Sequence, residues 1–202
     1  ATVRSPWGSA PILVPSPARL NVVNALFAIA AGGACGVAPE VSAHSLLRFE
    51  APAGRLRTIP LANGGSCIDD CYNAAPDSME GALGVLAAAE VGAAGKRVAV
   101  LGEMQELGAF AGEGHSQVGR AVARLCPDML VLIGDATRSI ESAARVDGYP
   151  ADRIHWFATS GEVAQLLPAV LSGSDIVLVK GSRAAGLESV VAAVEARLGV
   201  SR

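Results

Sequence analysis

Residues 97–133 read RVAVLGEMQELGAFAGEGHSQVGRAVARLCPDMLVLI and decide the fold. Residues 97–101 and 129–133 are short, continuous apolar segments rich in valine, leucine and isoleucine, which predicts two buried strands. Between them, residues 114–125 have the spacing of a helix that covers a sheet. Two fully apolar strands joined through a helix predict neighbouring parallel strands.

The same alternation extends to both sides of this segment. Further strands are predicted at residues 55–61, 66–69, 155–157 and 175–179, and further helices at 21–31, 76–91, 139–146, 161–171 and 186–198. This order predicts an α/β fold, with a mostly parallel sheet and helices on both faces, for residues 49–202. Residues 1–48 are too few for a domain of usual size, so we expect them to be the end of another one.

The composition excludes several classes of protein. Hydrophobic residues make up 51% of the chain, which is enough for a core, and the net charge is −3, without the basic excess of a nucleic-acid binder. Four cysteines without a Cys-x-x-Cys pair and three scattered histidines predict no metal site. The best candidate for a membrane span, residues 22–38, is short and contains three glycines. We therefore expect a soluble, cytoplasmic protein with reduced thiols.

Ligands of such sheets bind beyond the carboxyl ends of the strands, where three loops carry polar clusters. The first cluster is Asp-Asp-Cys-Tyr-Asn-Ala-Ala-Pro-Asp-Ser-Met, residues 69–79. The adjacent carboxylates of Asp69 and Asp70 can accept hydrogen bonds from a ribose or hold a cation. A turn followed by a helix cap at Asp77 explains part of the cluster, but not the Tyr-Asn pair.

The second cluster, residues 100–108, places Glu103 and Glu106 after a predicted strand, where they can face the amine of a ligand. A solvated acidic loop explains them equally well. His115, further along, fits a capping or surface histidine better than a catalytic base.

The third cluster, Lys-Gly-Ser-Arg at residues 180–183, joins a strand to a helix. Lys180, Ser182 and Arg183 place three donors before a helix amino end, which favours carboxylate or phosphate binding over surface salt bridges.

Several catalytic motifs are absent from the sequence. The only Gly-Lys step, at residues 95–96, lacks the spacing of a phosphate-binding P-loop. No Gly-x-Gly-x-x-Gly follows a strand, and no Gly-x-Ser-x-Gly elbow is present. No catalytic residue is therefore predicted in this chain.

Together, the clusters resemble the Mur ligase family. The family pattern Asp-Asp-Ser-Tyr-Asn-Ala-Asn-Pro-Asp-Ser-Met matches residues 69–79, with Cys71 for serine and Ala75 for asparagine. Leu-Gly-Asp/Glu-Met-x-Glu-Leu-Gly matches residues 101–108, and the family's Lys-Gly-Ser-Arg and His-x-x-Val-Gly are present at 180–183 and 115–119. Residues 20–26 resemble His-Asn-x-x-Asn-Ala-Leu, with Leu20 in place of histidine.

The resemblance implies one part of a three-domain enzyme. Residues 1–48 correspond to the end of the central ATP-binding domain, and residues 49–202 to the carboxyl-terminal, Rossmann-like domain. The motifs are most similar to those of enzymes that add D-alanyl-D-alanine to the UDP-N-acetylmuramoyl tripeptide, using ATP to form an amide bond through an acyl phosphate. The P-loop and the residues that bind Mg²⁺ belong to the family's central domain and have no counterpart here, so the chain is expected to be inactive alone.

Residue roles follow from the resemblance, position by position. The residues matched to nucleotide binding are Asn21 and Asn24 for adenine, Arg55 near the ribose or phosphates, and Asp70 for the ribose hydroxyls. Those in loops that face the incoming dipeptide are Asn73, Glu103, Ser182 and Arg183. Of these, Glu103 suits the ammonium group of the dipeptide, and Ser182 with Arg183 suits its carboxylate.

Two other hypotheses stay open. The chain can be a binding or regulatory module, with a Rossmann-like fold, that derives from such a ligase but does not catalyse. It can also belong to a related folate- or cyanophycin-type ligase of the same architecture, although the three clusters favour the cell-wall enzymes.

Overall fold

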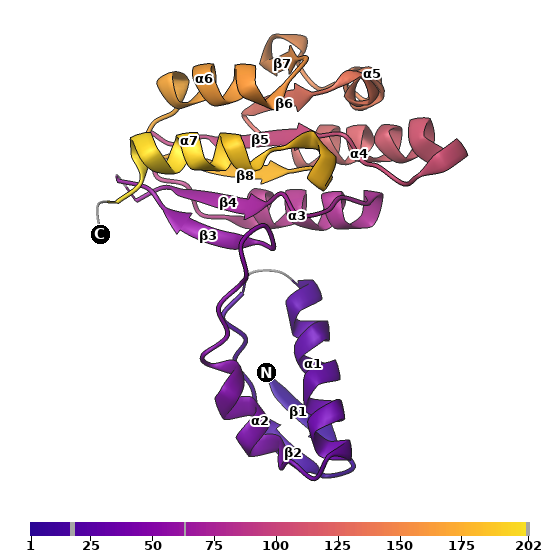
Figure 1. Cartoon of the computed structure of the whole chain (residues 1–202), viewed down its shortest axis with the longest axis vertical. Coiled ribbons are helices and arrows are strands. Elements are labelled where there is room, and N and C mark those ends of the chain that lie inside the picture. The colour runs from indigo at the N-terminus through magenta and orange to yellow at the C-terminus, as the bar shows by residue number, and fades with distance from the viewer. Residues whose placement is uncertain (17–18, 63, 201–202) are drawn as a thin grey trace. The chain divides into compact units, whose positions relative to one another are not determined.

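The computed structural model describes residues 1–16, 19–62 and 64–200. The chain divides into two compact units, Ala1–Ala51 and Pro52–Arg202 (Figure 1). The sequence predicted a division after residue 48, within the segment that leads from one unit to the other.

The first unit combines a hairpin with two helices. Strands β1 (Thr2–Ser5) and β2 (Gly8–Pro11) pair in antiparallel fashion, and helices α1 (Arg19–Ala34) and α2 (Pro39–Leu46) follow. Its small core consists of Val3, Ala10, Ile12, Ile29 and Ala43. The predicted helix at 21–31 lies within α1, whereas the hairpin and α2 were not predicted. Neither hairpin strand contains the apolar run that identifies a buried strand.

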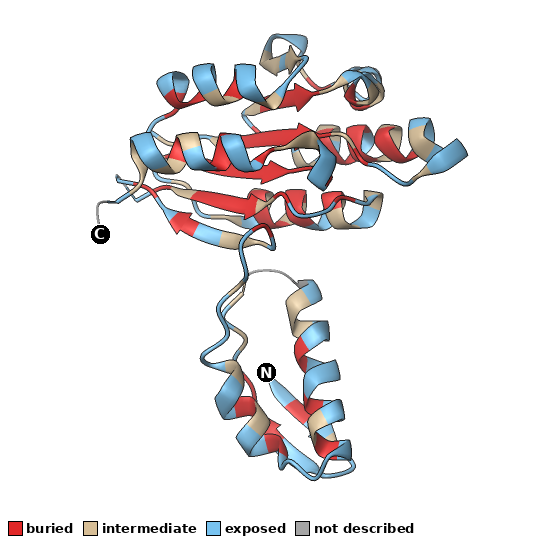
Figure 2. Ribbon diagram, viewed as in Figure 1, coloured by how far each residue is buried: buried red, intermediate tan, exposed pale blue. Residues whose placement is uncertain are grey.

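The second unit contains a six-stranded sheet, in the order β3-β4-β8-β5-β6-β7. Only β3 is antiparallel to its neighbour, so the prediction of a mostly parallel sheet is confirmed. The strands are β3 (Arg57–Pro60), β4 (Ser66–Asp70), β5 (Arg97–Gly102), β6 (Met129–Ile133), β7 (Ile154–Phe157) and β8 (Ile176–Lys180). The central strands carry apolar residues on both sides, and Figure 2 shows that these strands are buried. This pattern fits a sheet with helices on both faces.

Five helices cover this sheet. Helices α3 (Pro76–Ala88), α4 (Ala111–Leu125) and α5 (Arg138–Val146) lie on one face, and α6 (Ser160–Val170) and α7 (Glu188–Leu198) lie on the other (Figure 1). The short 3-10 turns η1 (Gly108–Phe110), η2 (Asp135–Thr137), η3 (Ala151–Arg153) and η4 (Arg183–Ala185) lie in the connections. The α/β fold with helices on both faces is therefore confirmed.

Helices α4 and α5 pack closely against each other at Gly119 of α4, where there is no room for a side chain. A Cβ atom at Gly119 would clash with the carbonyl oxygen of Ile140 and lie 2.8 Å from the Cβ of Ala143. Gly119→Ala is therefore expected to lower the free energy of unfolding by about 2 kcal/mol. Gly81→Ala in α3, where a Cβ meets no atom within 4 Å, should instead stabilise the protein by up to about 1 kcal/mol.

Urea unfolding of both variants checks this prediction. Trp156 in β7 reports on the second unit once Trp7, the other tryptophan of the chain, is replaced by phenylalanine. A Gly119→Ala protein as stable as its parent would mean that the two helices can move apart at little cost.

Candidate functional site

Most predicted site residues of the second unit lie at the carboxyl ends of three adjacent strands, whereas Arg55 precedes β3. Asp70 and Lys180 are the last residues of β4 and β8, and they lie opposite each other in the parallel register. On the other side of β8, Leu101 of β5 lies opposite Lys180, and Glu103 follows β5 directly. The sheet order thus brings together loops from distant parts of the sequence.

A buried ion pair connects β4 to β8. The Nζ atom of Lys180 donates to Asp70 Oδ2 at 2.7 Å and to the carbonyl oxygen of Asn73 at 3.0 Å. The backbone N–H of Leu56 donates to the other oxygen of Asp70, Oδ1, at 3.1 Å. Burial raises the pKa of Asp70 above its ordinary value, although Lys180 and the Leu56 N–H favour the charged form.

This ion pair changes the interpretation of the third cluster. Only 2% of Lys180 is exposed, and its charge is matched by Asp70, so it is not a free donor for an incoming anion. The helix amino end is also displaced, because η4 intervenes and α7 begins only at Glu188. The prediction of three donors at a helix start was therefore wrong for Lys180, and Ser182 and Arg183 remain.

Ser182 is buried without a partner for its hydroxyl group. Only 3% of the residue is exposed, and among the described residues no donor or acceptor reaches its Oγ atom. Its backbone N–H donates to the carbonyl oxygen of Glu103 at 2.9 Å, which fixes the loop after β8 to the loop after β5. An unsatisfied buried hydroxyl is costly, which makes Ser182 a candidate for a contact with a ligand or a bound water.

Glu103 connects the loops that follow β5 and β6. Its Oε1 accepts a hydrogen bond from the backbone N–H of Ala136 at 2.9 Å, and its Oε2 accepts one from the side chain of Gln105 at 3.3 Å. A side chain at Gly134 would clash with this carboxylate. Glu103 is thus held in place by its neighbours, while its contact with a substrate amine stays a prediction.

The two adjacent aspartates have separate surroundings, which the sequence did not reveal. Consecutive residues of a strand point to opposite faces of a sheet. Asp69 accepts from Gly54 N at 2.9 Å, pairs with Arg57 at 3.3 Å and accepts from the Cys71 thiol at 3.0 Å. The expectation that both carboxylates act together on one ligand is not supported, because only Asp70 is paired with Lys180.

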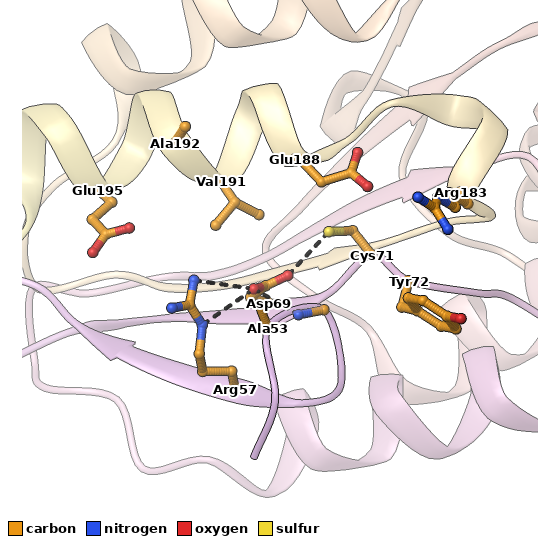
Figure 3. A pocket seen from close by; sticks show the side chains of 11 residues that line it. Ala53, Arg57, Asp69, Cys71, Tyr72, Arg183, Glu188, Val191, Ala192 and Glu195 are labelled. Carbon is orange, nitrogen blue, oxygen red and sulfur yellow. Dashed lines mark hydrogen bonds and ion pairs between the residues drawn. The ribbon is translucent and has the colours of Figure 1, made fainter. Parts of the chain in front are cut away.

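A cavity of about 320 Å³ lies between α7 and the edge of the sheet (Figure 3). Asp69, with its partners Arg57 and Cys71, lies on one side, and α7 presents Glu188, Val191, Ala192 and Glu195 on the other. Its remaining lining residues are Ala53, Gly54, Tyr72 and Arg183. Arg183 is exposed and therefore available to a ligand.

The thiol groups of Cys67, on β4, and Cys71, which lines the cavity, are both buried. Burial, followed by the negative charge of Asp69, raises the pKa of Cys67 to about 12. Burial and the hydrogen bond to Asp69 likewise raise the pKa of Cys71, which stands where the family pattern has serine. Both thiols stay protonated at neutral pH, and that of Cys71 serves as a donor.

Arg55 lies next to the end of β4. Its guanidinium stacks over the ring of Tyr72 at 4.1 Å from the centroid, and both side chains are exposed. The N–H of Tyr72 donates to the carbonyl oxygen of Gly54 at 3.1 Å, which ties the loop before β3 to the loop after β4. Arg55, Asp70 and Asn73 therefore belong to one connected region.

The remaining predicted residues, Asn21 and Asn24, lie on α1 of the first unit. Asn21 Nδ2 donates to Ser16 Oγ at 2.7 Å, and Asn24 is exposed. Their role in adenine binding stays a prediction.

His115 is a structural residue of the second unit. Its Nε2 accepts from the N–H of Met104 at 3.0 Å, so its Nδ1 carries the proton and donates to the carbonyl oxygen of Ala111 at 2.7 Å. With both nitrogens engaged and 1% of the residue exposed, it holds the second cluster against α4.

Within residues 1–16, 19–62 and 64–200, no three side chains of histidine, cysteine, aspartate or glutamate are grouped as metal ligands. No helix in these ranges combines the length and the apolar character that a membrane crossing requires.

Comparisons with known proteins identify the family of this chain. The family model "Mur ligase, glutamate ligase domain" matches residues 54–183. The UDP-N-acetylmuramoyl-tripeptide--D-alanyl-D-alanine ligase of Escherichia coli (strain K12) is 35% identical over 195 residues, which are 96% of this chain and 41% of that ligase. The ligase of the same name from Bacillus subtilis (strain 168) is 33% identical over 88% of this chain and 38% of its own length. The chain thus spans about two fifths of the length of these relatives.

Solved structures show the same relationship. A crystal structure of MurF from Acinetobacter baumannii has a TM-score of 0.83 and 30% identity, covering 96% of this chain and 41% of that one. MurF from Thermotoga maritima in complex with ADP has a TM-score of 0.67 and 23% identity over 84% of this chain and 36% of its own, which supports the fold alone. Because the family model covers more than half of the residues, this chain belongs to the Mur ligase family, and residues 54–183 form its glutamate ligase domain.

Proposed function

We propose that this chain is the carboxyl-terminal part of an ATP-dependent ligase that adds D-alanyl-D-alanine to the UDP-N-acetylmuramoyl tripeptide of peptidoglycan precursors. The observation that carries the proposal is the buried, unpartnered hydroxyl of Ser182, next in sequence to the exposed Arg183, where β4, β8 and β5 end. The names of the E. coli and B. subtilis relatives, which are 35% and 33% identical to this chain, state the joining of these two substrates.

The nucleotide contacts are proposed for Asp70, Arg55, Asn21 and Asn24. Each carboxylate oxygen of Asp70 has one hydrogen bond from the protein and a second lone pair to offer, and 13% of the side chain is exposed. A ribose hydroxyl can therefore donate to it. The exposed guanidinium of Arg55 suits the phosphates.

The dipeptide contacts are proposed for Ser182, Arg183, Glu103 and Asn73. D-alanyl-D-alanine has one carboxylate and one ammonium group. Arg183 can bind the carboxylate with two parallel hydrogen bonds, and the free hydroxyl of Ser182 can donate a further one. Glu103 Oε2, which accepts only from Gln105 in the described residues, can receive the ammonium. Asn73 is exposed in the neighbouring loop.

The contribution of the chain to catalysis is orientation. Holding the dipeptide amine close to the activated carboxyl group of the tripeptide lowers the entropic cost of the reaction. Phosphate transfer also needs a backbone cradle, a lysine and Mg²⁺ to neutralise charge. The sequence contains no P-loop, and the described residues offer no grouped ligands for Mg²⁺. We propose that the central domain implied by the family resemblance supplies these elements, and that this chain orients the dipeptide.

A chimaeric enzyme tests the proposed function. In it, this chain replaces the matching 41% of the E. coli ligase. The chimaera is expected to release phosphate only with ATP, tripeptide substrate and D-alanyl-D-alanine together, whereas the chain alone releases none. A folded chimaera that binds ADP but forms no product would favour a non-catalytic binding module instead.

Within the chimaera, Asp70→Ala is expected to raise the KM for ATP by roughly ten- to a hundredfold. This range corresponds to the loss of a hydrogen bond to a charged group. The matched control is Asp77→Ala, which removes an exposed carboxylate from the same cluster and should leave the KM for ATP unchanged. An unaltered KM in Asp70→Ala, together with a normal melting curve, would contradict the assignment of Asp70.

A further inference from the structure

Lys180 is the largest fully buried charged side chain of the described residues, and the proposed contacts with substrates do not use it. It is one of the two lysines of the chain, and the other, Lys96, is exposed. A buried ammonium group is costly unless it is paired and hydrogen-bonded. The partners that pair with the Lys180 ammonium therefore indicate the role of this residue.

Its two hydrogen bonds lead to different parts of the site. One is the 2.7 Å contact with Asp70, the residue proposed for the ribose. The other is the 3.0 Å contact with the carbonyl oxygen of Asn73, in the loop proposed for the dipeptide. Two residues after Lys180, the Ser182 N–H binds the loop of Glu103. A single ammonium group thus fixes both proposed subsites to the end of β8.

The ion pair with Lys180 also reduces the negative charge that a nucleotide would meet at Asp70. An unpaired carboxylate would repel the phosphates of a nucleotide, because like charges in a partly buried site are poorly screened. Lys180 compensates this charge and leaves the oxygens able to accept hydrogen bonds. With Leu56 N–H on Oδ1 and Lys180 on Oδ2, the carboxylate is held in one orientation.

We propose that Lys180 is a positioning residue that holds Asp70 for the nucleotide and the Asn73 loop for the dipeptide, and thereby couples the two subsites. This inference rests on the proposed function and adds to it a residue that touches neither substrate.

The test compares four variants of the chimaeric enzyme by their KM for ATP, KM for D-alanyl-D-alanine and kcat. Lys180→Met is expected to raise both KM values about tenfold, because it releases both contacts. Asp70→Asn should raise the KM for ATP alone, since Lys180 then keeps its bond to Asn73. The double variant should match Asp70→Asn in its KM for ATP and Lys180→Met in its KM for the dipeptide. Lys96→Met is the matched control and should resemble the parent.

A general structural role for Lys180 predicts a different pattern. The changes in the KM for ATP would then multiply in the double variant, because Lys180 would act independently of Asp70. That result would overturn the proposal, as would a Lys180→Met enzyme with the KM values of Lys96→Met.

Two further outcomes are distinguishable. If Lys180→Met alone does not fold, the double variant, which has no uncompensated carboxylate, is compared with Asp70→Asn. Equal KM values for the dipeptide would then overturn the proposal, and a higher value in the double variant would support it. If ATP use does not depend on Asp70 at all, the proposed function of that residue fails first, and the inference fails with it.

Discussion

Replacing Lys180 by methionine is expected to lower the free energy of unfolding by about 3 kcal/mol at neutral pH, the low end of the range for breaking a buried ion pair. Methionine fills a similar volume but leaves Asp70 Oδ2 and the Asn73 carbonyl oxygen without the donor that Lys180 supplied. The Lys180 and Asp70 side chains are only 2% and 13% exposed, so water cannot fully replace the ammonium. The ion pair itself contributes less than this to the stability of the parent, because the cost of burying both charges offsets much of their attraction.

This loss should depend on pH in a definite direction. Burial raises the pKa of Asp70 in the folded chain above its ordinary value of 3.8. Folding therefore favours the protonated carboxyl. The stability that comes from this preference is fully present below the ordinary pKa of Asp70, and it is lost as the pH rises through the raised pKa of the folded chain. Without Lys180, which favours the charged form, the pKa of Asp70 rises further. The variant should therefore approach its parent in acidic buffer and differ most at neutral pH.

Urea unfolding at neutral and at mildly acidic pH, followed by Trp156 fluorescence in the Trp7→Phe background, measures the difference between variant and parent. The matched control is Lys96→Met, which removes the exposed lysine and should cost less than about 0.5 kcal/mol at either pH. If the free energy of unfolding of Lys180→Met lies below that of the parent by the same amount at both pH values, an uncompensated Asp70 carboxylate is not the cause.

The fold of the second unit could be predicted from the sequence because each central strand is apolar on both sides. Residues 97–101 and 129–133 can be buried only where helices cover both faces, and this requirement leads to a mostly parallel sheet. The hairpin of the first unit has no such signature. Its strands, Thr2–Ser5 and Gly8–Pro11, bury Val3 and Ala10 and expose most of their other residues. A short strand with one small buried side chain looks like a loop in the sequence.

The position of the candidate residues at the strand ends could be predicted from the sequence, but their contacts could not. The strand ends that hold Asp70, Glu103 and Ser182 follow from the alternation of strands and helices. The pairing of Lys180 with Asp70 follows from β4 and β8 being neighbours, which chain order does not reveal because β5, β6 and β7 intervene in the sequence. Once the sheet order is known, the register places the two residues opposite each other.

The separation of Asp69 from Asp70 was also hidden in the sequence. Adjacent carboxylates suggest a joint ligand, whereas the pleat of β4 sends them to different surroundings. Arg57 and Asp69 form an ion pair across the β3–β4 hairpin, because its antiparallel register places them opposite each other. A register cannot be derived from the pattern of a single strand.

Arg183 is expected to determine the use of D-alanyl-D-alanine. In the chimaeric enzyme, Arg183→Lys should raise the KM for the dipeptide by roughly ten- to a hundredfold and leave the KM for ATP nearly unchanged. The range corresponds to the loss of one charge-assisted hydrogen bond, because lysine keeps the positive charge but cannot form two parallel bonds with a carboxylate. Arg183 is exposed and forms no ion pair among the described residues, so the substitution removes no internal contact of that kind.

The control for this prediction is Arg197→Lys, which changes an exposed arginine in the last turn of α7 that does not line the cavity. Steady-state kinetics with each substrate varied in turn separate the two KM values. A substrate analogue with an amide in place of the terminal carboxylate adds a second test, because Arg183 can no longer bind it as a charge. The parent and Arg183→Lys enzymes should then differ little in their KM for the analogue. If Arg183→Lys affects ATP, dipeptide and analogue alike, the arginine supports the shape of the loop after β8, and another residue binds the carboxylate.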